Sequence, residues 1–408
     1  KANVSHYSVR IFGRPHMEGY SPNALSGYTF PYLSSKTTKI YDPRTGKNKS
    51  TRIKYTYDVN DNNPDNDYGN IIEIKEYSFK DELLKKSVIT YTTPNLTDWI
   101  IGKPSTSTVY EGDETTKVSE AQYHYDGLAL DNEPIKGSLT KEEKWLDYPA
   151  SRHIATNFTY DTCGNIESVI DVLGRTTTTT YDSTKTFPKS VQNAIGHTQE
   201  FTYNKATGKI LTSTNPNGQI TTSTYDGFGR IVNVVGPGDI SEATYVYALD
   251  MSPVKITTET KVDTGQHIKA YSFVDGLGRQ ILSRVQAEYQ GTPKHIVSGE
   301  VEYDSRGQVI KKYLPYYIEV PSPEDVYTPP SKSTPFVAYK YDVMGRLIET
   351  IRPDNKSSYV IYGLNTVESV NENGQRIKQI KDEYGRIIEI EEEGGYITTY
   401  VYDTLGNL

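Results

Sequence analysis

The sequence predicts an all-β protein, an extended antiparallel β-meander of Tyr-Asp repeats whose strands run back and forth along one sheet. Three observations lead to this prediction. A phrase that opens with Tyr-Asp and closes with Gly recurs along the chain, the turn-opening residues return at a constant interval, and the residues between them favour strands.

The recurring phrase is an aromatic residue, Asp, two variable residues, Gly, a polar residue and an aliphatic residue. Asp can accept hydrogen bonds from the backbone amides just ahead of it, and Gly can adopt the positive φ that a type I turn plus bulge requires. We therefore interpret the phrase as a hairpin turn. The residues assigned to these turns are Tyr160, Asp161, Gly164, Asp171, Gly174, Arg175, Tyr225, Asp226, Gly229, Arg230, Asp275, Gly278, Arg279, Tyr303, Asp304, Gly307, Tyr341, Asp342, Gly345, Arg346, Asp382, Gly385, Arg386, Tyr402, Asp403 and Gly406.

The interval between turns sets the strand length. The turn-opening residues in the most regular stretch are Asp161, Asp171, Asp182, Asn193, Asn204, Asn215 and Asp226, in steps of 10 or 11 residues. Such a step, less the turn itself, leaves a strand of about six residues, roughly 20 Å long. Successive turns must then lie on opposite edges of the sheet.

The composition fits strands with half-wet faces. The chain has 35 Tyr against 9 Phe and 2 Trp, and aromatic and β-branched side chains favour strands. We expect the Tyr of each unit to stack on its counterpart in the neighbouring strand, at ~0.5–1 kcal/mol per pair. Because strand twist accumulates, a sheet of more than about ten strands is expected to curl into a spiral or cylinder.

Four regions are expected along the chain. Residues 1–150 form an irregular β-rich region that leads into the repeats, 151–314 hold regular repeats, 315–335 form a Pro-rich inserted loop, and 336–408 hold further repeats. Proline cannot donate to a ladder, so we expect the inserted loop to leave the sheet. Because the chain begins at Lys1 and ends within a repeat, we expect a fragment of a longer polypeptide that lacks its own signal.

Charge and cysteine content exclude several classes. The net charge is -8 with both signs interspersed, which gives no positive track for nucleic acid. A single cysteine, Cys163, excludes an internal disulfide. No run approaches the ~20 apolar residues of a membrane helix.

The Tyr-Asp-x-x-Gly-Arg units resemble the RHS/YD-repeat family of bacterial polymorphic toxins, of the B and C subunits of Tc toxin complexes and of the animal teneurins. Residues 1–150 are similar to the region that leads into the repeats of Tc B-type subunits, on the phrase Trp145-Leu146-Asp147-Tyr148-Pro149. The resemblance implies a sheet that spirals into a hollow shell around a C-terminal toxic polypeptide until delivery. It also implies secretion or a cell-surface location, and two partners: the rest of the same polypeptide and a delivery or closing subunit. The closing domain with its Asp-based self-cleavage residues is not found in this sequence.

One stretch could bind a metal. Asp58, Asn60, Asn62, Asp65 and Asp67 place oxygen donors as a calcium loop does, but Gly is missing at the sixth position and Glu at the twelfth. A repeat turn stretched by insertion explains these residues as well, so they are a weak calcium candidate.

The remaining reactive residues do not form a site. The histidines, at positions 6, 16, 124, 153, 197, 267 and 295, are scattered and are expected on the surface or in packing. Cys163 has no basic neighbour to activate it. We expect neither an enzyme nor a bound cofactor.

Two functions remain. The first is a structural shell segment that encapsulates a toxin, in which the turn arginines pair with neighbouring carboxylates along the rim. The second is an extracellular adhesion or carbohydrate-binding array, in which exposed tyrosines contact the ligand.

Overall fold

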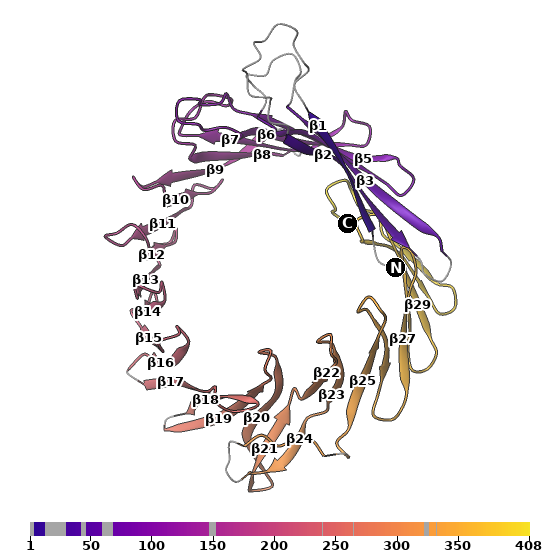
Figure 1. Cartoon of the computed structure of the whole chain (residues 1–408). Coiled ribbons are helices and arrows are strands. Elements are labelled where there is room, and N and C mark those ends of the chain that lie inside the picture. Colours follow the sequence, from indigo (N-terminus) through magenta and orange to yellow (C-terminus); the bar gives the residue numbers. More distant parts are fainter. Residues whose placement is uncertain are drawn as a thin grey trace, which may run out of the picture. The chain divides into compact units, whose positions relative to one another are not determined.

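The computed structural model describes residues 4–12, 30–41, 46–58, 68–146, 152–238, 240–263, 265–321, 326–331 and 333–408. Every regular element in these ranges is a β-strand (Figure 1), and each strand pairing given below is antiparallel. The predicted all-β antiparallel meander is therefore confirmed. The described ranges contain no helix with the length and apolar character that a membrane span requires.

The strands are numbered in chain order. They are β1 (Val4–Phe12), β2 (Phe30–Tyr41), β3 (Asn48–Tyr57), β4 (Ile71–Tyr77), β5 (Leu83–Tyr91), β6 (Pro104–Glu111), β7 (Lys117–Tyr125), β8 (Leu139–Leu146), β9 (Arg152–Tyr160), β10 (Ile166–Ile170), β11 (Thr176–Tyr181), β12 (Pro188–Gln192), β13 (Thr198–Tyr203), β14 (Ile210–Thr214), β15 (Ile220–Tyr225) and β16 (Ile231–Gly236). They continue with β17 (Ile240–Ala248), β18 (Val254–Asp263), β19 (Gln266–Val274), β20 (Gln280–Tyr289), β21 (Thr292–Ser298), β22 (Val301–Tyr303), β23 (Val309–Tyr313), β24 (Tyr316–Glu319), β25 (Phe336–Tyr341), β26 (Leu347–Ile351), β27 (Ser357–Tyr362), β28 (Thr366–Val370), β29 (Arg376–Lys381), β30 (Ile387–Glu392) and β31 (Ile397–Thr399).

The chain forms two compact units. Unit 1 comprises residues 1–178, 362–368 and 377–408, and unit 2 comprises residues 179–361 and 369–376. In unit 1, each strand from β1 to β10 pairs with the next one along the chain. The same unit contains the pairings of β29 with β30 and of β30 with β31.

Residues 1–150 are more regular than the sequence predicts. Four strands there, β3, β4, β5 and β7, end in a tyrosine at which the pairing register shifts by a bulge, as at Tyr57 and Tyr91, and β6 has such a shift at Tyr110, one residue before its end. The turns that follow Tyr57, Tyr91 and Tyr125 are long, because the next strand begins only at Ile71, Pro104 and Leu139. Residues 147–149 of the phrase that begins at Trp145 lie outside the described residues.

Unit 2 contains the main hydrophobic core. Its first strands, β12 to β16, are short repeats of the kind that the sequence predicts. The core consists of Tyr271, Phe273, Leu282 and Val297 on β19, β20 and β21. Phe273 is fully buried.

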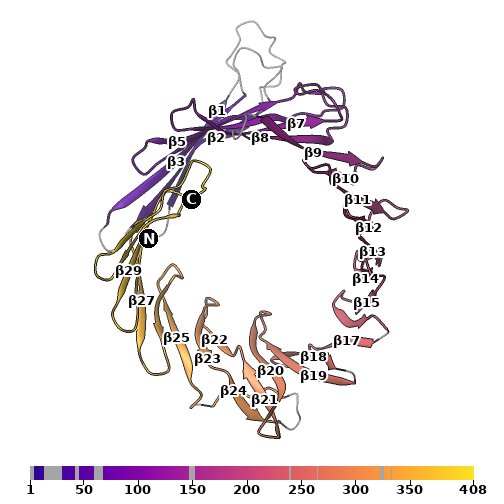
Figure 2. The same ribbon diagram turned by 180° about the vertical axis from the view of Figure 1, so that it is seen from behind.

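Part of the region 315–335, which the prolines predict to be an inserted loop outside the sheet, joins the sheet. Tyr316–Glu319 form β24, which pairs with β21, and these strands lie side by side in both views (Figures 1 and 2). The four residues contain no proline, so their amides remain available to the ladder. Further along, Tyr327 packs its ring edge-on against Phe273, with 5.5 Å between centroids. The buried Arg284 guanidinium donates to the Val326 carbonyl at 2.8 Å. The insertion therefore covers the core of unit 2.

A buried carboxylate lies beside this insertion. Glu300 is 3% exposed, and its Oε2 accepts a hydrogen bond from the Tyr316 hydroxyl at 2.7 Å. Its Oε1 has no hydrogen-bond partner among the described residues. Burial, reinforced by the neighbouring Glu302 carboxylate, raises the pKa of Glu300 above its ordinary value.

This pKa predicts that unit 2 is more stable in mild acid. A carboxyl whose pKa is higher in the folded than in the unfolded state stabilises the fold at low pH, and this contribution is lost as the pH rises through the folded-state pKa. Glu300→Gln keeps the acceptor for Tyr316 and removes the charge. We expect it to raise the stability at pH 7 by roughly 1 kcal/mol and to flatten the pH dependence, as measured by thermal unfolding at pH 5 and pH 7.

Glu302→Gln is the matched control. Glu302 forms an ion pair with Lys311 at 2.9 Å, so its neutralisation is expected to leave stability at pH 7 unchanged or lower. A Glu300→Gln variant with the stability of the parent at both pH values would contradict the argument.

Candidate functional site in the repeat turns

The repeat turns that open with Asp are closed by the carboxylate of that Asp. In the turn at Asp226, the Asp226 amide donates to the Arg230 carbonyl at 2.9 Å and the Gly229 amide donates to the Asp226 carbonyl at 3.0 Å. Asp226 Oδ1 accepts the amides of Phe228 at 2.9 Å and of Arg230 at 3.0 Å. Gly229 has a φ of 76°, which a residue with a Cβ adopts only with strain.

Other predicted turn residues make the same bonds. The Asp carboxylate accepts the amide four residues further on at Asp161, Asp171, Asp275, Asp304, Asp342, Asp382 and Asp403. Hydrogen bonds from the backbone and side chain of Arg279 hold the pKa of Asp275 below its ordinary value. Asn193 and Asn215 accept the corresponding amides with their side-chain oxygens, which explains why the turn tolerates Asn.

The turn arginines pair within their own turn. Arg230 Nε lies 2.7 Å from Asp226 Oδ2, and Arg175, Arg279, Arg346 and Arg386 contact the Asp four residues earlier in the same way. The sequence predicts pairing with neighbouring carboxylates along the rim, whereas the partner observed is the carboxylate of the same turn.

The turn tyrosines connect successive turns on one edge of the sheet. The hydroxyl of each donates to the carbonyl of the residue that follows the previous turn on that edge: Tyr225 to Ile210 at 2.9 Å, Tyr341 to Val309 at 2.8 Å and Tyr402 to Ile387 at 2.9 Å. Tyr303 and Tyr247 make the same bond, to Gln280 and Ile231.

Where the previous turn closes with an arginine, the ring of the turn tyrosine lies against that arginine. The guanidinium carbon is 4.1 Å from the ring centroid for Arg279 over Tyr303, and 4.5 Å for Arg386 over Tyr402. The expected stacking of Tyr on Tyr in neighbouring strands does not describe these contacts. Adjacent strands run in opposite directions, so equivalent tyrosines are two strands apart, about 9.6 Å, too far for ring contact. Arg fills the gap.

Three further tyrosines, outside the repeat turns predicted from the sequence, make the same bond in unit 1. The hydroxyls of Tyr57, Tyr91 and Tyr125 donate to Leu33, Ile71 and Pro104, and that of Tyr160, already assigned, donates to Leu139. After Tyr125, the Asp126 carboxylate accepts four amides between Ile135 and Ser138. The Tyr-Asp pairs at 57–58 and 125–126 are the signal that could have identified these turns, but the expected Gly does not follow at the usual distance.

The weak calcium candidate begins at one of these long turns. Asp58 accepts hydrogen bonds from the amide and the side chain of Asn70, both at 2.9 Å, as the turn-opening Asp does elsewhere. Asn60, Asn62, Asp65 and Asp67 lie outside the described residues. In the part of the chain that the structure describes, no group of three or more His, Cys, Asp or Glu side chains is arranged to hold a metal ion.

The other reactive residues lie apart from one another. Cys163 is exposed at a turn tip, and its amide donates to Asp161. His124 pairs with Glu143 and His153 with Glu120, both at 2.8 Å.

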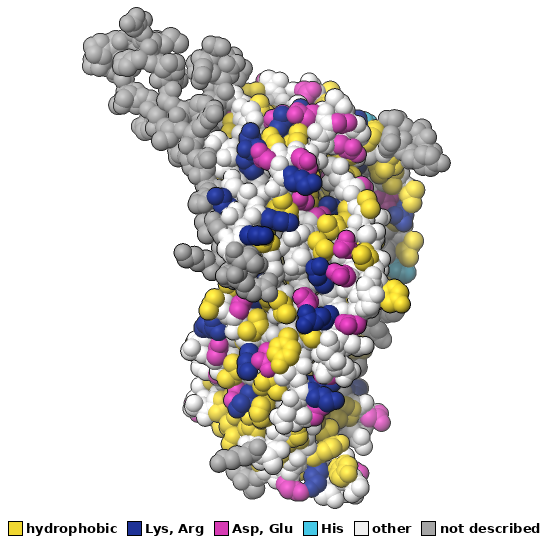
Figure 3. Space-filling view, turned by 90° about the vertical axis from the view of Figure 1, so that its right-hand side faces the viewer, with side chains coloured by type: hydrophobic (Ala, Val, Ile, Leu, Met, Phe, Trp, Pro, Cys, Tyr) yellow, Lys and Arg dark blue, Asp and Glu magenta, His cyan; other side chains and the backbone are white. Residues whose placement is uncertain are grey.

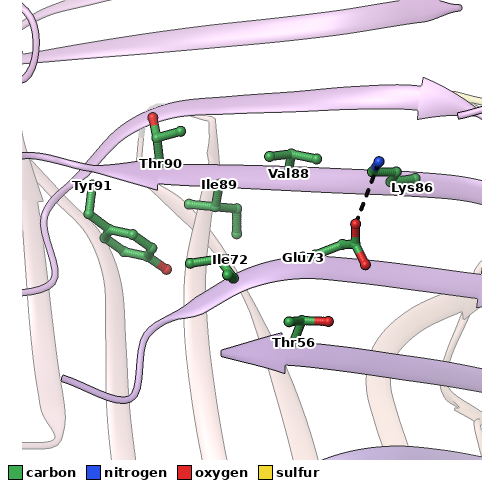
Figure 4. A pocket seen from close by; sticks show the side chains of 8 residues that line it. All are labelled: Thr56, Ile72, Glu73, Lys86, Val88, Ile89, Thr90 and Tyr91. Atoms are coloured by element: carbon green, nitrogen blue, oxygen red, sulfur yellow. Dashed lines mark ion pairs between the residues drawn. The ribbon is translucent and has the colours of Figure 1, made fainter. Parts of the chain in front are cut away.

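A cavity of about 490 Å³ opens on unit 1. It is lined by Thr56, Ile72, Glu73, Lys86, Val88, Ile89, Thr90 and Tyr91 on β3, β4 and β5 (Figure 4). Glu73 and Lys86 face each other across it at 3.5 Å, and Lys86 also lies 3.2 Å from Glu114. Acidic and basic side chains are likewise interspersed on the face in Figure 3.

Comparison with known proteins identifies the repeats. The RHS repeat model matches residues 203–239, and the model of a domain of unknown function, DUF6443, matches residues 249–343. A search of curated protein sequences gives no match.

Solved Tc toxin structures have the same fold. The crystal structure of TcdB2-TccC3 is 13% identical, with a TM-score of 0.74 over 99% of this chain and 28% of that chain. The Tc holotoxin pore of Photorhabdus luminescens is 12% identical, with a TM-score of 0.78 over 100% of this chain and 29% of that chain. This chain thus spans less than a third of the length of those chains.

The turns, the meander and these matches define an RHS/YD-repeat protein. Within that class the chain is similar in fold to the Tc toxin structures.

The tyrosine bond between turns predicts a specific role for the hydroxyl. Tyr341→Phe retains the ring and removes the bond to Val309, so we expect a loss of about 1 kcal/mol in unfolding free energy. Tyr359→Phe is the control, since Tyr359 lies within β27 and is 45% exposed. Equal melting temperatures of the two variants would show that the hydroxyl contributes nothing.

The role of the turn carboxylate predicts that two substitutions of Asp342 destabilise the protein to different degrees. Asp342→Ala leaves the amides of Met344 and Arg346 without their acceptor, which is expected to cost about 1–2 kcal/mol. Asp342→Asn should cost less, because Asn193 and Asn215 hold equivalent turns. Thermal unfolding that ranks Asn as low as Ala would refute the role of the accepted amides.

Proposed function

We propose that this chain is a segment of the wall of an RHS-repeat toxin, which encapsulates a C-terminal toxic polypeptide until delivery. The observation that carries the proposal is the fold likeness to TcdB2-TccC3 and the Tc holotoxin pore, with TM-scores of 0.74 and 0.78 over at least 99% of this chain. The wall would act by excluding proteases and other proteins from the enclosed polypeptide.

The chemistry of the repeats supports a wall rather than an active site. The turn carboxylates accept amides and arginines of their own turns, and the turn tyrosines donate to backbone carbonyls. Side chains engaged in this way hold strands together and are not free to bind or transform a substrate. We accordingly propose that the chain has no enzymatic activity of its own.

The proposal also names partners and a location. The enclosed polypeptide would be the C-terminal part of the same protein, and a delivery or closing subunit would bind the assembled wall. One related structure is described as TcdB2-TccC3 without its hypervariable C-terminal region, with a TM-score of 0.77. By analogy, we propose a secreted or cell-surface toxin.

Limited proteolysis tests encapsulation. The full-length protein that contains this chain would be purified with an epitope tag on its C-terminal polypeptide and digested in parallel with that polypeptide expressed alone. We expect the enclosed polypeptide to survive at least tenfold longer, because the wall keeps the protease out. After denaturation in urea and removal of the urea immediately before digestion, both samples should be cut at the same rate.

Equal digestion rates without denaturation would reject encapsulation. The competing function, a carbohydrate-binding array, is favoured by an exposed aromatic pair: Tyr289 and Tyr317 are 47% and 50% exposed, with ring centroids 5.0 Å apart. If the wall fails to protect, saturable retention of the isolated chain on glycans would favour that function instead.

A further inference from the structure

Within unit 1, a hairpin near the N-terminus contacts a repeat turn near the C-terminus. The Phe79 amide, in the turn between β4 and β5, donates to Glu383 Oε1 at 3.1 Å across 304 residues of sequence. Lys49 Nζ on β3 donates to Asn365 Oδ1 at 3.0 Å across 316 residues. These contacts use side chains on at least one side, so they are separate from the hydrogen-bond ladder between strands.

Tyr384 occupies the centre of this contact. Lys85 Nζ lies 5.4 Å from its ring centroid and the Arg386 guanidinium lies 4.9 Å from it. The Glu76 carboxylate is 3.0 Å from Lys85. Burial, together with the charge of the nearby Glu76 carboxylate, raises the pKa of Tyr384, so the hydroxyl keeps its proton. Two cations and one carboxylate thus surround a single aromatic ring.

Glu383 and Tyr384 stand at the two variable positions of the Asp382 turn. At the position of Tyr384 in other turns, Phe228 is 86% and Leu277 79% exposed, whereas Met344 is 41% and Leu405 50% exposed. Tyr384 is 43% exposed. The turn-opening Asp and the Gly are common to all of these turns. Only the residues at the two variable positions distinguish the turn that contacts the β4–β5 hairpin.

We propose that Glu383 and Tyr384, with Phe79, Lys85 and Glu76, form a clasp that reversibly fastens the C-terminal repeats to the β4–β5 hairpin. The clasp consists of charge-assisted and cation–aromatic contacts at a partly exposed surface, which salt weakens strongly. The strands on either side are held by their own ladders, so the clasp can open while both remain folded. It therefore provides a place where the chain can open and close.

The proposed clasp does not depend on the proposed function. It is a property of the chain without any enclosed polypeptide, so either proposal can fail while the other stands.

Distance measurements between spin labels test the clasp. In a Cys163→Ser background, which removes the one native cysteine, labels at Lys80→Cys and Thr399→Cys report on the hairpin and on β31. We expect a narrow distance distribution at low salt. That narrow population should be lost in Tyr384→Ala, in Glu383→Lys and in 1 M NaCl, where screening acts within about 3 Å.

Matched variants at other turns separate the clasp from a general effect on turns. Phe228→Ala and Val343→Lys introduce the same residues at equivalent positions of other turns and should leave the distribution unchanged. A second label pair, Lys80→Cys with Thr115→Cys, lies on neighbouring hairpins of unit 1 and should keep its distance in every variant, which shows that the sheet remains folded.

A broad distribution between Lys80 and Thr399 in the parent would overturn the proposal. So would a narrow distribution that survives both Tyr384→Ala and Glu383→Lys.

Discussion

Most of the described repeat turns of this fold depend on a side-chain oxygen that accepts the amides of the same turn. A hairpin leaves backbone amides without partners at its tip, and an exposed tip offers only water in exchange. The carboxylate of Asp226, or the amide oxygen of Asn215, supplies the acceptor from within the turn. Because the acceptor for these amides belongs to the turn itself, the turn does not depend on the residue types of the neighbouring strands.

The tyrosine hydroxyl adds a second level of order. Backbone pairing connects each strand to the next, whereas the bond from Tyr341 to Val309 connects a turn to the previous turn on the same edge. The arginine of the earlier turn, where present, lies between them, paired to its own Asp and stacked on the following Tyr, as with Arg279 and Tyr303. Asp, Arg and Tyr therefore form one connected polar row along an edge. A sheet with few large apolar side chains can be held together in this way.

The turns could be predicted from the sequence because their hydrogen bonds are local, whereas the longer-range contacts could not be predicted. Spacing and residue type were enough to predict the meander, because an Asp and a Gly at fixed separation determine a turn by themselves. The partner of Tyr341 could not be predicted from composition, since stacking and hydrogen bonding both favour Tyr at that position. The strand at Tyr316–Glu319 was obscured by the prolines around it. The contact between Phe79 and Glu383 depends on residues 304 apart, for which no local pattern exists.

The long turn between Asp126 and Ser138 shows how tolerant this arrangement is. Twelve residues separate the two ends, yet Asp126 still accepts the amides that close the turn, and Tyr160 still reaches Leu139 just beyond it. Extra chain is thus added outside the sheet, where it disturbs neither edge. Loops of new length and chemistry can be acquired there during evolution, while the strands below retain their register.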